Sequence, residues 1–344
     1  MSSKNKLLIF IIVTPLLLIM AGGLYLKQNL FSAYSGKDTH FHISPGEGFA
    51  SINYRLKNKK IIPSARLFHY YTKFTDRINA MKAGTYLIKT GSTPVEVLDT
   101  LTNGVPILTK VTIPEGKNMY EIGKLLEDAQ ITSYDEFIKL CRSDEFIQSL
   151  DINAPSIEGY LFPETYLFAP ETPAKEVIQL MLKEFKKQTS KLSFYHDLLS
   201  PHQVIILASI VEKETGAKWE RPTIAGVYLN RLRKKMRLQA DPTTIYGIWE
   251  NYDGNLKKKH LLEKTPYNTY RINGLPLGPI ANPSLAAIKA VLNPKEHNYI
   301  YFVSKNDGTH IFTSTYKEHL KAVDFWQRNA KNRKGKSWRD LKQK

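Results

Sequence analysis

The feature that most constrains the fold is an uncharged apolar run of twenty residues near the N-terminus, residues 7–26 (LLIFIIVTPLLLIMAGGLYL). In a helix, a run of this length spans the roughly 30 Å hydrocarbon core of a bilayer. A cleaved signal peptide has a shorter apolar core followed directly by a small-residue cleavage site. We therefore expect an uncleaved, single transmembrane helix; the alternative is a buried core helix of unusual length.

The charges beside this run suggest its orientation. Lys4 and Lys6 precede it, which favours a cytoplasmic N-terminus, although Lys27 and Lys37 on the other side weaken the asymmetry. The rest of the chain would then fold outside the membrane. The domains predicted from the sequence are a cytoplasmic tail (1–6), the membrane helix (7–26), a linker (27–39), a β/α module (40–109), a second β/α unit with a helical connection (110–156), a main domain (157–330) and a basic tail (331–344).

The charge balance indicates an acidic partner. The formal net charge of +17 fits nucleic acid, an anionic membrane surface or an anionic polymer, and charge alone does not choose among them. Export of the main body disfavours nucleic acid. The single cysteine, Cys141, excludes an internal disulfide. The sequence has no clustered His and Cys ligand pattern, so we expect neither a metal ion nor another cofactor.

Two segments share one pattern, a strand, a Pro/Gly turn and a helix, at residues 41–56 and 110–131. Between them, residues 82–88 read as a strand, and residues 93–101 read as a helix with Thr93 as N-cap and Pro94 in its first turn. The 40–109 module resembles the LysM-type fold, which binds glycans. A generic α+β spacer domain is the alternative. The predicted fold class is α+β: a membrane helix, a LysM-like module and a mixed α/β catalytic domain.

A helical segment at residues 204–215 (VIILASIVEKET) carries the first candidate for chemistry. At about 100° per residue, Glu214 falls on the apolar stripe and Glu212 falls well away from it, near Ile205. Burial disfavours a charged carboxylate and raises its pKa, which suits a general acid near neutral pH. The alternative is that Glu214 only ends the helix, in water or in an ion pair.

Other segments gather aromatic and polar side chains. Residues 157–166 (IEGYLFPETY) have the composition of a cleft wall, or of a turn that packs its rings into the core. Residues 236–247 offer hydrogen-bonding groups, although Asp241 also reads as a helix cap. The candidate substrate-binding residues are Glu158, Tyr160, Glu164, Asn230, Gln239, Asp241, Thr243, Tyr246, Asn268 and Tyr270.

Six motifs in order carry a resemblance to a known family: IEGYLFPETY (157–166), ASIVEKET (208–215), YLNRL (228–232), LQADPT (238–243), YNTY (267–270) and GLPLGPI (274–280). Together they resemble the endolytic murein transglycosylase, or YceG-like, family over nearly the whole chain. The departures are small: Leu277 stands where the family often has a second Pro, and Ala240 where it often has Ser or Thr.

The resemblance implies a lyase of the cell inner membrane, with its catalytic domain in the periplasm. Its substrate would be the glycan strands of nascent peptidoglycan, with peptidoglycan synthases as candidate partners and no nucleic acid. The family's catalytic glutamate matches Glu214. One carboxyl group suffices for such a lyase, because it can first donate a proton to the leaving oxygen and then accept one from the sugar's own C6 hydroxyl. The alternatives are a hydrolase that adds Glu158 or Glu164 as a second acid, and a non-catalytic peptidoglycan-binding scaffold.

Overall fold

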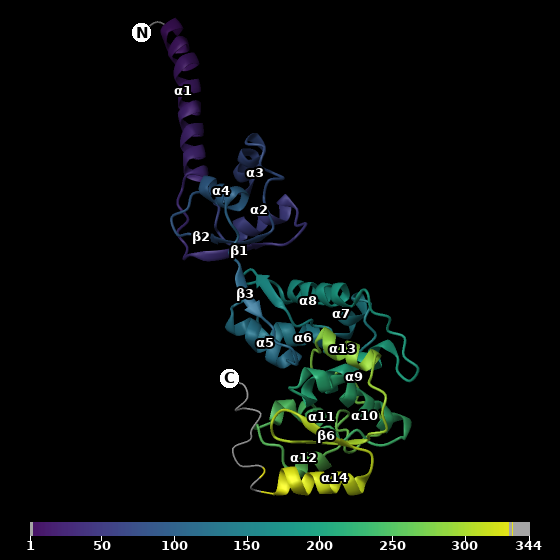
Figure 1. Ribbon diagram of the computed structural model, residues 1–344. Coiled ribbons are helices and arrows are strands. Elements are labelled where there is room, and N and C mark those ends of the chain that lie inside the picture. The colour runs from purple at the N-terminus through teal and green to yellow at the C-terminus, as the bar shows by residue number, and fades with distance from the viewer. Residues whose placement is uncertain (1–2, 330–331, 333–344) are drawn as a thin grey trace. The chain divides into compact units, whose positions relative to one another are not determined.

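The computed structural model describes residues 3–329 and 332, with the backbone alone for residues 3–12. The chain forms two compact units (Figure 1). The first comprises Met1–Thr109 with Leu167–Thr172, and the second comprises Lys110–Tyr166 with Pro173–Lys344. The basic tail predicted at 331–344 lies outside the described residues except for Asn332, as do the first two residues of the predicted cytoplasmic tail.

The first unit contains four helices and two strands in its described part: α1 (Ser3–Leu30), β1 (Thr39–Ile43), α2 (Phe49–Asn58), α3 (Ala65–Phe74), β2 (Gly84–Ile88) and α4 (Pro94–Asn103). β1 and β2 pair antiparallel, with Phe41 opposite Tyr86. Both rings are buried in the core of the unit, together with Leu56 of α2 and Leu98 of α4.

Local signals set α4 where the sequence predicts it. The Thr93 hydroxyl accepts a hydrogen bond from the backbone N–H of Glu96, and the Glu96 carboxylate accepts one from the backbone N–H of Thr93. This reciprocal pair satisfies two backbone donors that the first helical turn would otherwise leave free. Helix α2, by contrast, has Gly48 as its N-cap residue and therefore no side-chain cap.

The second unit is mostly helical. Its elements are β3 (Thr109–Thr112), α5 (Met119–Asp128), α6 (Tyr134–Cys141), α7 (Asp144–Ser149), β4 (Thr165–Phe168), α8 (Ala174–Thr189), α9 (Pro201–Glu214), α10 (Arg221–Arg233), α11 (Asp241–Gly247), α12 (Lys258–Leu262), α13 (Leu285–Leu292), β5 (Tyr301–Ser304), β6 (His310–Thr313) and α14 (Tyr316–Val323), with short 3₁₀ turns at Lys218–Glu220 and Trp249–Asn251 and a π turn at Asp324–Arg328. β3 is bonded to β4, and β5 and β6 form an antiparallel hairpin.

Helix α9 lies at the centre of this unit and packs against α10, α11 and α13 (Figure 1). Every residue from Val204 to Val211 is buried, including Ile205 and Ser209. The assumption of one apolar stripe on this helix is therefore wrong, because neighbouring helices cover it on more than one side. A buried position on α9 consequently says little about which way its terminal glutamates point.

The two predicted strand–turn–helix segments are present, as β1 with α2 and as β3 with α5. The mixed α/β fold predicted from the sequence is likewise what the structure shows. The finer division of the chain into seven parts, from the cytoplasmic tail to the basic tail, stays a prediction. In the part of the chain that the structure describes, no helix combines the length and the apolar character needed to cross a bilayer.

Candidate active site

A groove of about 890 Å³ lies at the C-terminal end of α9. One wall comes from Glu115 and Gly116 after β3, and another from Trp219 in the segment that follows α9. The β5–β6 hairpin supplies the opposite side with Phe302 and His310. Glu214, the last residue of α9, lines this groove, so the helix delivers a carboxyl group to an open cavity.

One tyrosine holds the Glu214 carboxyl group. The Tyr228 hydroxyl of α10 donates a hydrogen bond of 2.6 Å to Glu214 Oε1. Tyr228 itself is buried, and its ring meets Phe302 edge to face at 5.9 Å between centroids. Among the residues that the structure describes, none hydrogen-bonds the second oxygen of Glu214. One carboxyl oxygen is thus fixed by the protein while the other is left for a ligand.

The surroundings of Glu214 raise its pKa from 4.5 to about 7. Burial is the largest cause, because it removes water from the charged form, and the negative charge of Asp241 acts in the same direction. The hydrogen bond from Tyr228 and the positive charge of Arg231 oppose this rise. With a pKa of about 7, both protonation states of Glu214 are populated at neutral pH, as an acid that must later act as a base requires.

The prediction that the Glu212 side chain lies away from the buried side of the helix is wrong. The Glu212 carboxylate is only 5 % exposed and lies 2.5 Å from a guanidinium nitrogen of the buried Arg221. It also accepts hydrogen bonds from the backbone N–H and the hydroxyl of Ser284, the N-cap of α13. Glu212 therefore ties α9 to α10 and α13. We infer a structural role, since both carboxylate oxygens are engaged by Arg221 and Ser284.

Two of the candidate substrate-binding residues lie near Glu214. The charge of Asp241 acts on the pKa of Glu214, and the Tyr270 hydroxyl donates a 2.7 Å hydrogen bond to Asp241. Asp241 does not cap α11, as the sequence had suggested: Ala240 is the N-cap, and the side chain of Asp241 makes no cap hydrogen bond. Its carboxylate is turned toward Tyr270 instead.

Glu158 and Tyr246 form a buried network of their own. Glu158 is fully buried and accepts hydrogen bonds from the backbone N–H of Met119, the Tyr246 hydroxyl and the Asn282 amide. Burial raises its pKa to about 8. Neither Glu158 nor the exposed Glu164 lines the groove that contains Glu214. The structure thus offers neither of them as a second acid in that groove.

Three further candidates hold the protein together. Thr243 and Asn268 are fully buried: Thr243 bonds the Thr269 hydroxyl, and the Asn268 amide donates to three backbone carbonyls of residues 260–263. The Asn230 amide donates to the carbonyls of His297 and Tyr299. These contacts fix the loop around α12 and the approach to the β5–β6 hairpin, so they shape the site without entering it.

The remaining candidates lie elsewhere in the second unit. The Tyr160 hydroxyl hydrogen-bonds His202 at 2.8 Å, and its ring stacks on that imidazole. Gln239 is exposed, at a positive φ of 51°, and its backbone N–H donates to the Thr269 carbonyl. Neither residue lines the Glu214 groove.

The sequence analysis missed several residues that build the groove. Arg231 donates to the carbonyls of Ile300 and Leu238, which joins α10 to the hairpin strand. The His310 ring and backbone N–H both bond the carboxylate of Glu220, which also lies 3.5 Å from the Thr215 hydroxyl. The YLNRL motif holds Tyr228 and Arg231 three residues apart, on one side of a helix, and this spacing was the available signal.

The described residues contain no group of three or more His, Cys, Asp or Glu side chains placed to hold a metal ion.

Residues 41–325 match the model of the YceG-like family. The chain belongs to this family. The resemblance inferred from the six sequence motifs is thereby confirmed. A protein of Bacillus subtilis (strain 168) named endolytic murein transglycosylase is 32 % identical over 89 % of this chain and 91 % of its own length.

Other relatives agree with this membership. A Streptococcus pneumoniae (strain ATCC BAA-255 / R6) protein with the same name is 26 % identical over 93 % of the chain, and the match spans 65 % of that protein. The crystal structure of a yceG-like protein from Listeria monocytogenes superposes with a TM-score of 0.56 and 31 % identity, covering 83 % of this chain and 99 % of the other. The fold of this family member is thus shared with a solved structure.

Proposed function

We propose that this chain is an endolytic murein transglycosylase, a lyase that cleaves the glycan strands of peptidoglycan at internal bonds. The observation that carries the proposal is Glu214: a carboxyl group with a pKa of about 7, held by Tyr228, at the edge of a groove of about 890 Å³. The names of the Bacillus and Streptococcus relatives support the same reaction class.

The reaction needs one group that changes its protonation state. Protonated Glu214 donates its proton to the oxygen between MurNAc and GlcNAc, and the bond from that oxygen to the MurNAc anomeric carbon breaks. The C6 hydroxyl of the same MurNAc then forms a bond to the anomeric carbon and gives its proton to the Glu214 carboxylate. The products are a 1,6-anhydro-MurNAc end and a free GlcNAc hydroxyl, with the acid restored.

Tyr228 suits both halves of this cycle. Its hydroxyl donates to Glu214, so it stabilises the carboxylate that forms after the first proton transfer. Burial and the negative charge of Asp241 act against that carboxylate and keep its proton available at neutral pH. The balance of these effects gives a group able to work as acid and then as base.

Product analysis separates the lyase from its alternatives. Uncrosslinked glycan strands are incubated with the full chain, and the released fragments are weighed by mass spectrometry. We expect fragments lighter by one water than hydrolytic products. The Glu214→Gln variant should release none, whereas Glu145→Gln, which changes an exposed carboxylate on α7, should behave as the unmodified chain does. Reducing ends of full mass would indicate a hydrolase, and binding without cleavage would indicate a scaffold.

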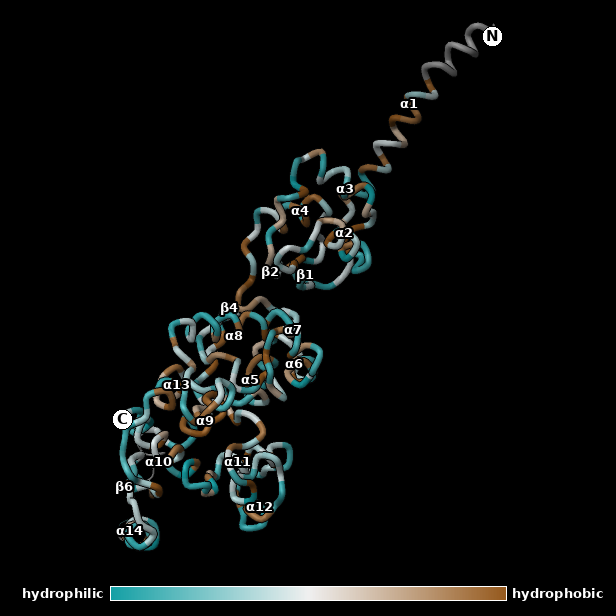
Figure 2. The backbone as a smooth tube through the Cα atoms, turned by 90° about the vertical axis from the view of Figure 1, so that its right-hand side faces the viewer, coloured by the Kyte–Doolittle hydropathy of each residue, from teal (hydrophilic) through white to brown (hydrophobic). Residues whose placement is uncertain are grey.

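Membrane anchoring forms a second part of the proposal. The run 7–26 would cross the inner membrane once, with the N-terminus in the cytoplasm and the catalytic groove in the periplasm. Residues 7–12 of the run are outside the residues whose side chains are described. From Val13 onward, the large apolar side chains of α1, such as Leu16, Leu18 and Ile19, are exposed, and Figure 2 shows several hydrophobic turns along this helix. Such exposure is unfavourable in water and favourable in lipid.

Alkaline carbonate extraction tests the anchor. The full chain should stay with the membrane pellet, and Leu17→Arg, which places a charge near the middle of the run, should shift it toward the supernatant. Release of the unmodified chain by carbonate would contradict an integral anchor.

Residues 40–109 would act as a LysM-like glycan-binding module, and a peptidoglycan synthase would supply the nascent strand. Loss of sacculus binding on removal of this module would support its role.

A further inference from the structure

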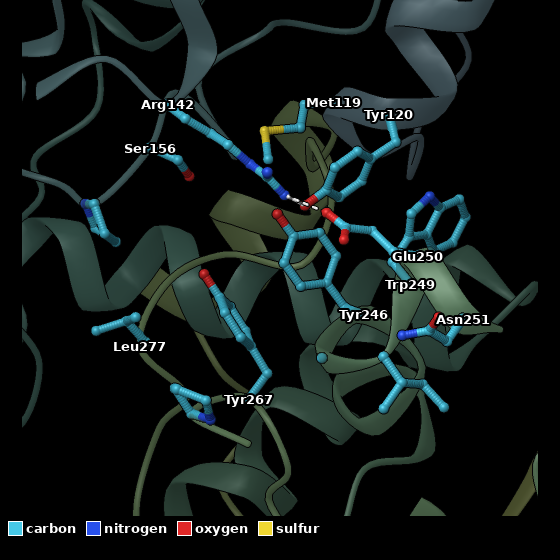
Figure 3. Close-up of a pocket in the computed structure, with 14 residues that line it drawn as sticks. Met119, Tyr120, Arg142, Ser156, Tyr246, Trp249, Glu250, Asn251, Tyr267 and Leu277 are labelled. Carbon is cyan, nitrogen blue, oxygen red and sulfur yellow. Dashed lines mark hydrogen bonds and ion pairs between the residues drawn. The ribbon is translucent and has the colours of Figure 1, made fainter. Parts of the chain in front are cut away.

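A second pocket of the same unit has walls of aromatic rings (Figure 3). Its volume is about 470 Å³. Tyr120 of α5, Tyr246 of α11, Trp249 and Tyr267 line it, and Figure 3 shows their rings around the pocket. None of the residues that line this pocket lines the Glu214 groove. The structure therefore separates the two cavities.

The rings of this pocket form connected faces. Tyr120 stacks on Trp249 at 5.9 Å with an angle of 13° between the planes. Tyr246 contacts Tyr120 at 5.9 Å and Tyr267 at 4.8 Å, both tilted. Flat apolar faces of this kind are the surfaces on which the C–H face of a sugar ring packs, while polar groups at the ring edges bind its hydroxyls.

Polar groups with free hydrogen-bonding capacity stand at the edges of these rings. Arg142 lies over the Tyr120 ring at 5.1 Å and bonds both the Tyr120 hydroxyl and, at 3.1 Å, the Glu250 carboxylate. Within residues 13–329, no protein group bonds the Tyr267 hydroxyl or the Trp249 indole N–H. The pocket therefore offers unused donors as well as a carboxylate acceptor to a ligand rich in hydroxyl and acetamido groups.

A network of hydrogen bonds within the protein holds the floor of the pocket. The Tyr246 hydroxyl donates to the buried Glu158 at 3.0 Å, and the backbone N–H of Met119 donates to the same oxygen at 2.9 Å. The Asn282 side-chain NH2 donates to the other Glu158 oxygen, and the Asn282 side-chain carbonyl oxygen accepts hydrogen bonds from the backbone N–H groups of Gly159 and Leu161. Because the floor is held by hydrogen bonds within the protein, a ligand would meet a preformed surface and would not have to order it first.

A short stretch of chain joins the pocket to the Glu214 groove. Glu115 and Gly116 line the groove, whereas Met119 and Tyr120 line the aromatic pocket. Only two residues lie between Gly116 and Met119. Their Cα atoms are at most about 11 Å apart, because each of the three steps between consecutive Cα atoms spans 3.8 Å. The linings of the two cavities therefore come within about 11 Å of each other at this stretch of the chain.

We infer that the pocket between Tyr120, Trp249 and Tyr267 is a distal saccharide subsite, which binds the same glycan strand several sugars away from the bond that is cut. The inference rests on the proposed function. Such a subsite would favour cleavage inside long strands. A long strand fills both cavities and is held at two points, whereas a short strand fills only one cavity. Affinity then increases with strand length because the second contact is made within one bound molecule.

Binding and cleavage of short and long uncrosslinked glycan strands test the subsite. Binding is measured on the full chain carrying Glu214→Gln, so that the strands stay intact. Adding Trp249→Ala should weaken the binding of long strands about tenfold, equivalent to about 1.4 kcal/mol, and leave short strands unaffected. Tyr267→Phe, which removes only the unused hydroxyl, should have the same selectivity with a smaller loss. The control is Tyr195→Ala, which removes an exposed ring that lines neither cavity.

In the chain with Glu214 intact, Trp249→Ala should raise the KM for long strands and leave kcat unchanged, a split that a general loss of folding would not give. Unchanged binding of long strands in both pocket variants would overturn the subsite, as would equal losses for short and long strands. Absence of cleavage by the unmodified chain would refute the proposed lyase, and the binding comparison would still decide the subsite.

Discussion

The Tyr228→Phe substitution tests whether the hydroxyl beside Glu214 sets its acidity. The change removes one oxygen and keeps the ring, which packs edge to face on Phe302 at 5.9 Å. The lost interaction is the 2.6 Å hydrogen bond to Glu214 Oε1. This bond favours the ionised form of Glu214, so its removal should raise the pKa of Glu214 above its present value of about 7.

The size of the shift follows from the energy of the bond. A hydrogen bond to a charged group contributes about 1.5–3 kcal/mol, and one pKa unit corresponds to about 1.4 kcal/mol. The pKa of Glu214 should therefore rise by about one to two units. Because the first proton transfer needs protonated Glu214, activity of the unmodified chain should fall as the pH rises through about 7, and the variant should keep its activity to a higher pH.

The assay is the pH dependence of kcat/KM for cleavage of long glycan strands, which reports the pKa of the free enzyme. A thermal unfolding curve at each pH shows whether the variant is folded. An alkaline limb that stays in place, or that moves to lower pH, would refute the reasoning, because it would mean that Glu214 is not the titrating acid or that Tyr228 does not stabilise its carboxylate.

Three further predictions concern the same end of α9. Asp241→Asn removes a charge that raises the pKa of Glu214, so the alkaline limb of the kcat/KM profile should move to lower pH, opposite to Tyr228→Phe. Glu214→Gln should raise the Tm above pH 7 and have little effect below pH 4.5. The Glu214 proton is bound more tightly in the folded state than in the unfolded state, so ionisation of Glu214 between pH 4.5 and about 7 lowers the stability of the unmodified chain. An equal Tm for both chains at every pH would contradict this. Glu212→Gln should lower the free energy of unfolding, measured by chemical denaturation, by about 3–5 kcal/mol, because the buried Arg221 loses its closest charged partner. A loss below about 1 kcal/mol would contradict a structural ion pair.

Local patterns predicted the elements well where a cap or a turn marked their ends. Thr93 was predicted as the N-cap of the helix at residues 93–101, and it caps α4. Where several helices meet, the pattern was less informative. The helical periodicity of α9 assigned one buried side to a helix that is buried on more than one side, and this put Glu212 in the wrong environment.

The candidate substrate-binding residues illustrate the same limit. Polar side chains within motifs can serve a ligand or the protein, and the sequence does not distinguish the two uses. The Asn268 amide donates to backbone carbonyls, and the Thr243 hydroxyl bonds a carbonyl and another hydroxyl. By contrast, the charge of Asp241 acts on the pKa of Glu214, and Tyr270 donates a hydrogen bond to Asp241. The aromatic pocket was out of reach for sequence reasoning, because Tyr120, Trp249 and Tyr267 come from separate segments.

The sequence by itself determined the family, through six ordered motifs, and the position of Glu214 at the end of a helix. Both are properties of residues close together in the chain. Only the tertiary structure decided that Tyr228 donates a hydrogen bond to Glu214 and that Glu158 is buried away from the groove. It also decided that the Glu212 carboxylate pairs with Arg221 and bonds Ser284. Hydrogen bonding and desolvation act over a few ångströms, and the partners that set them here come from different helices.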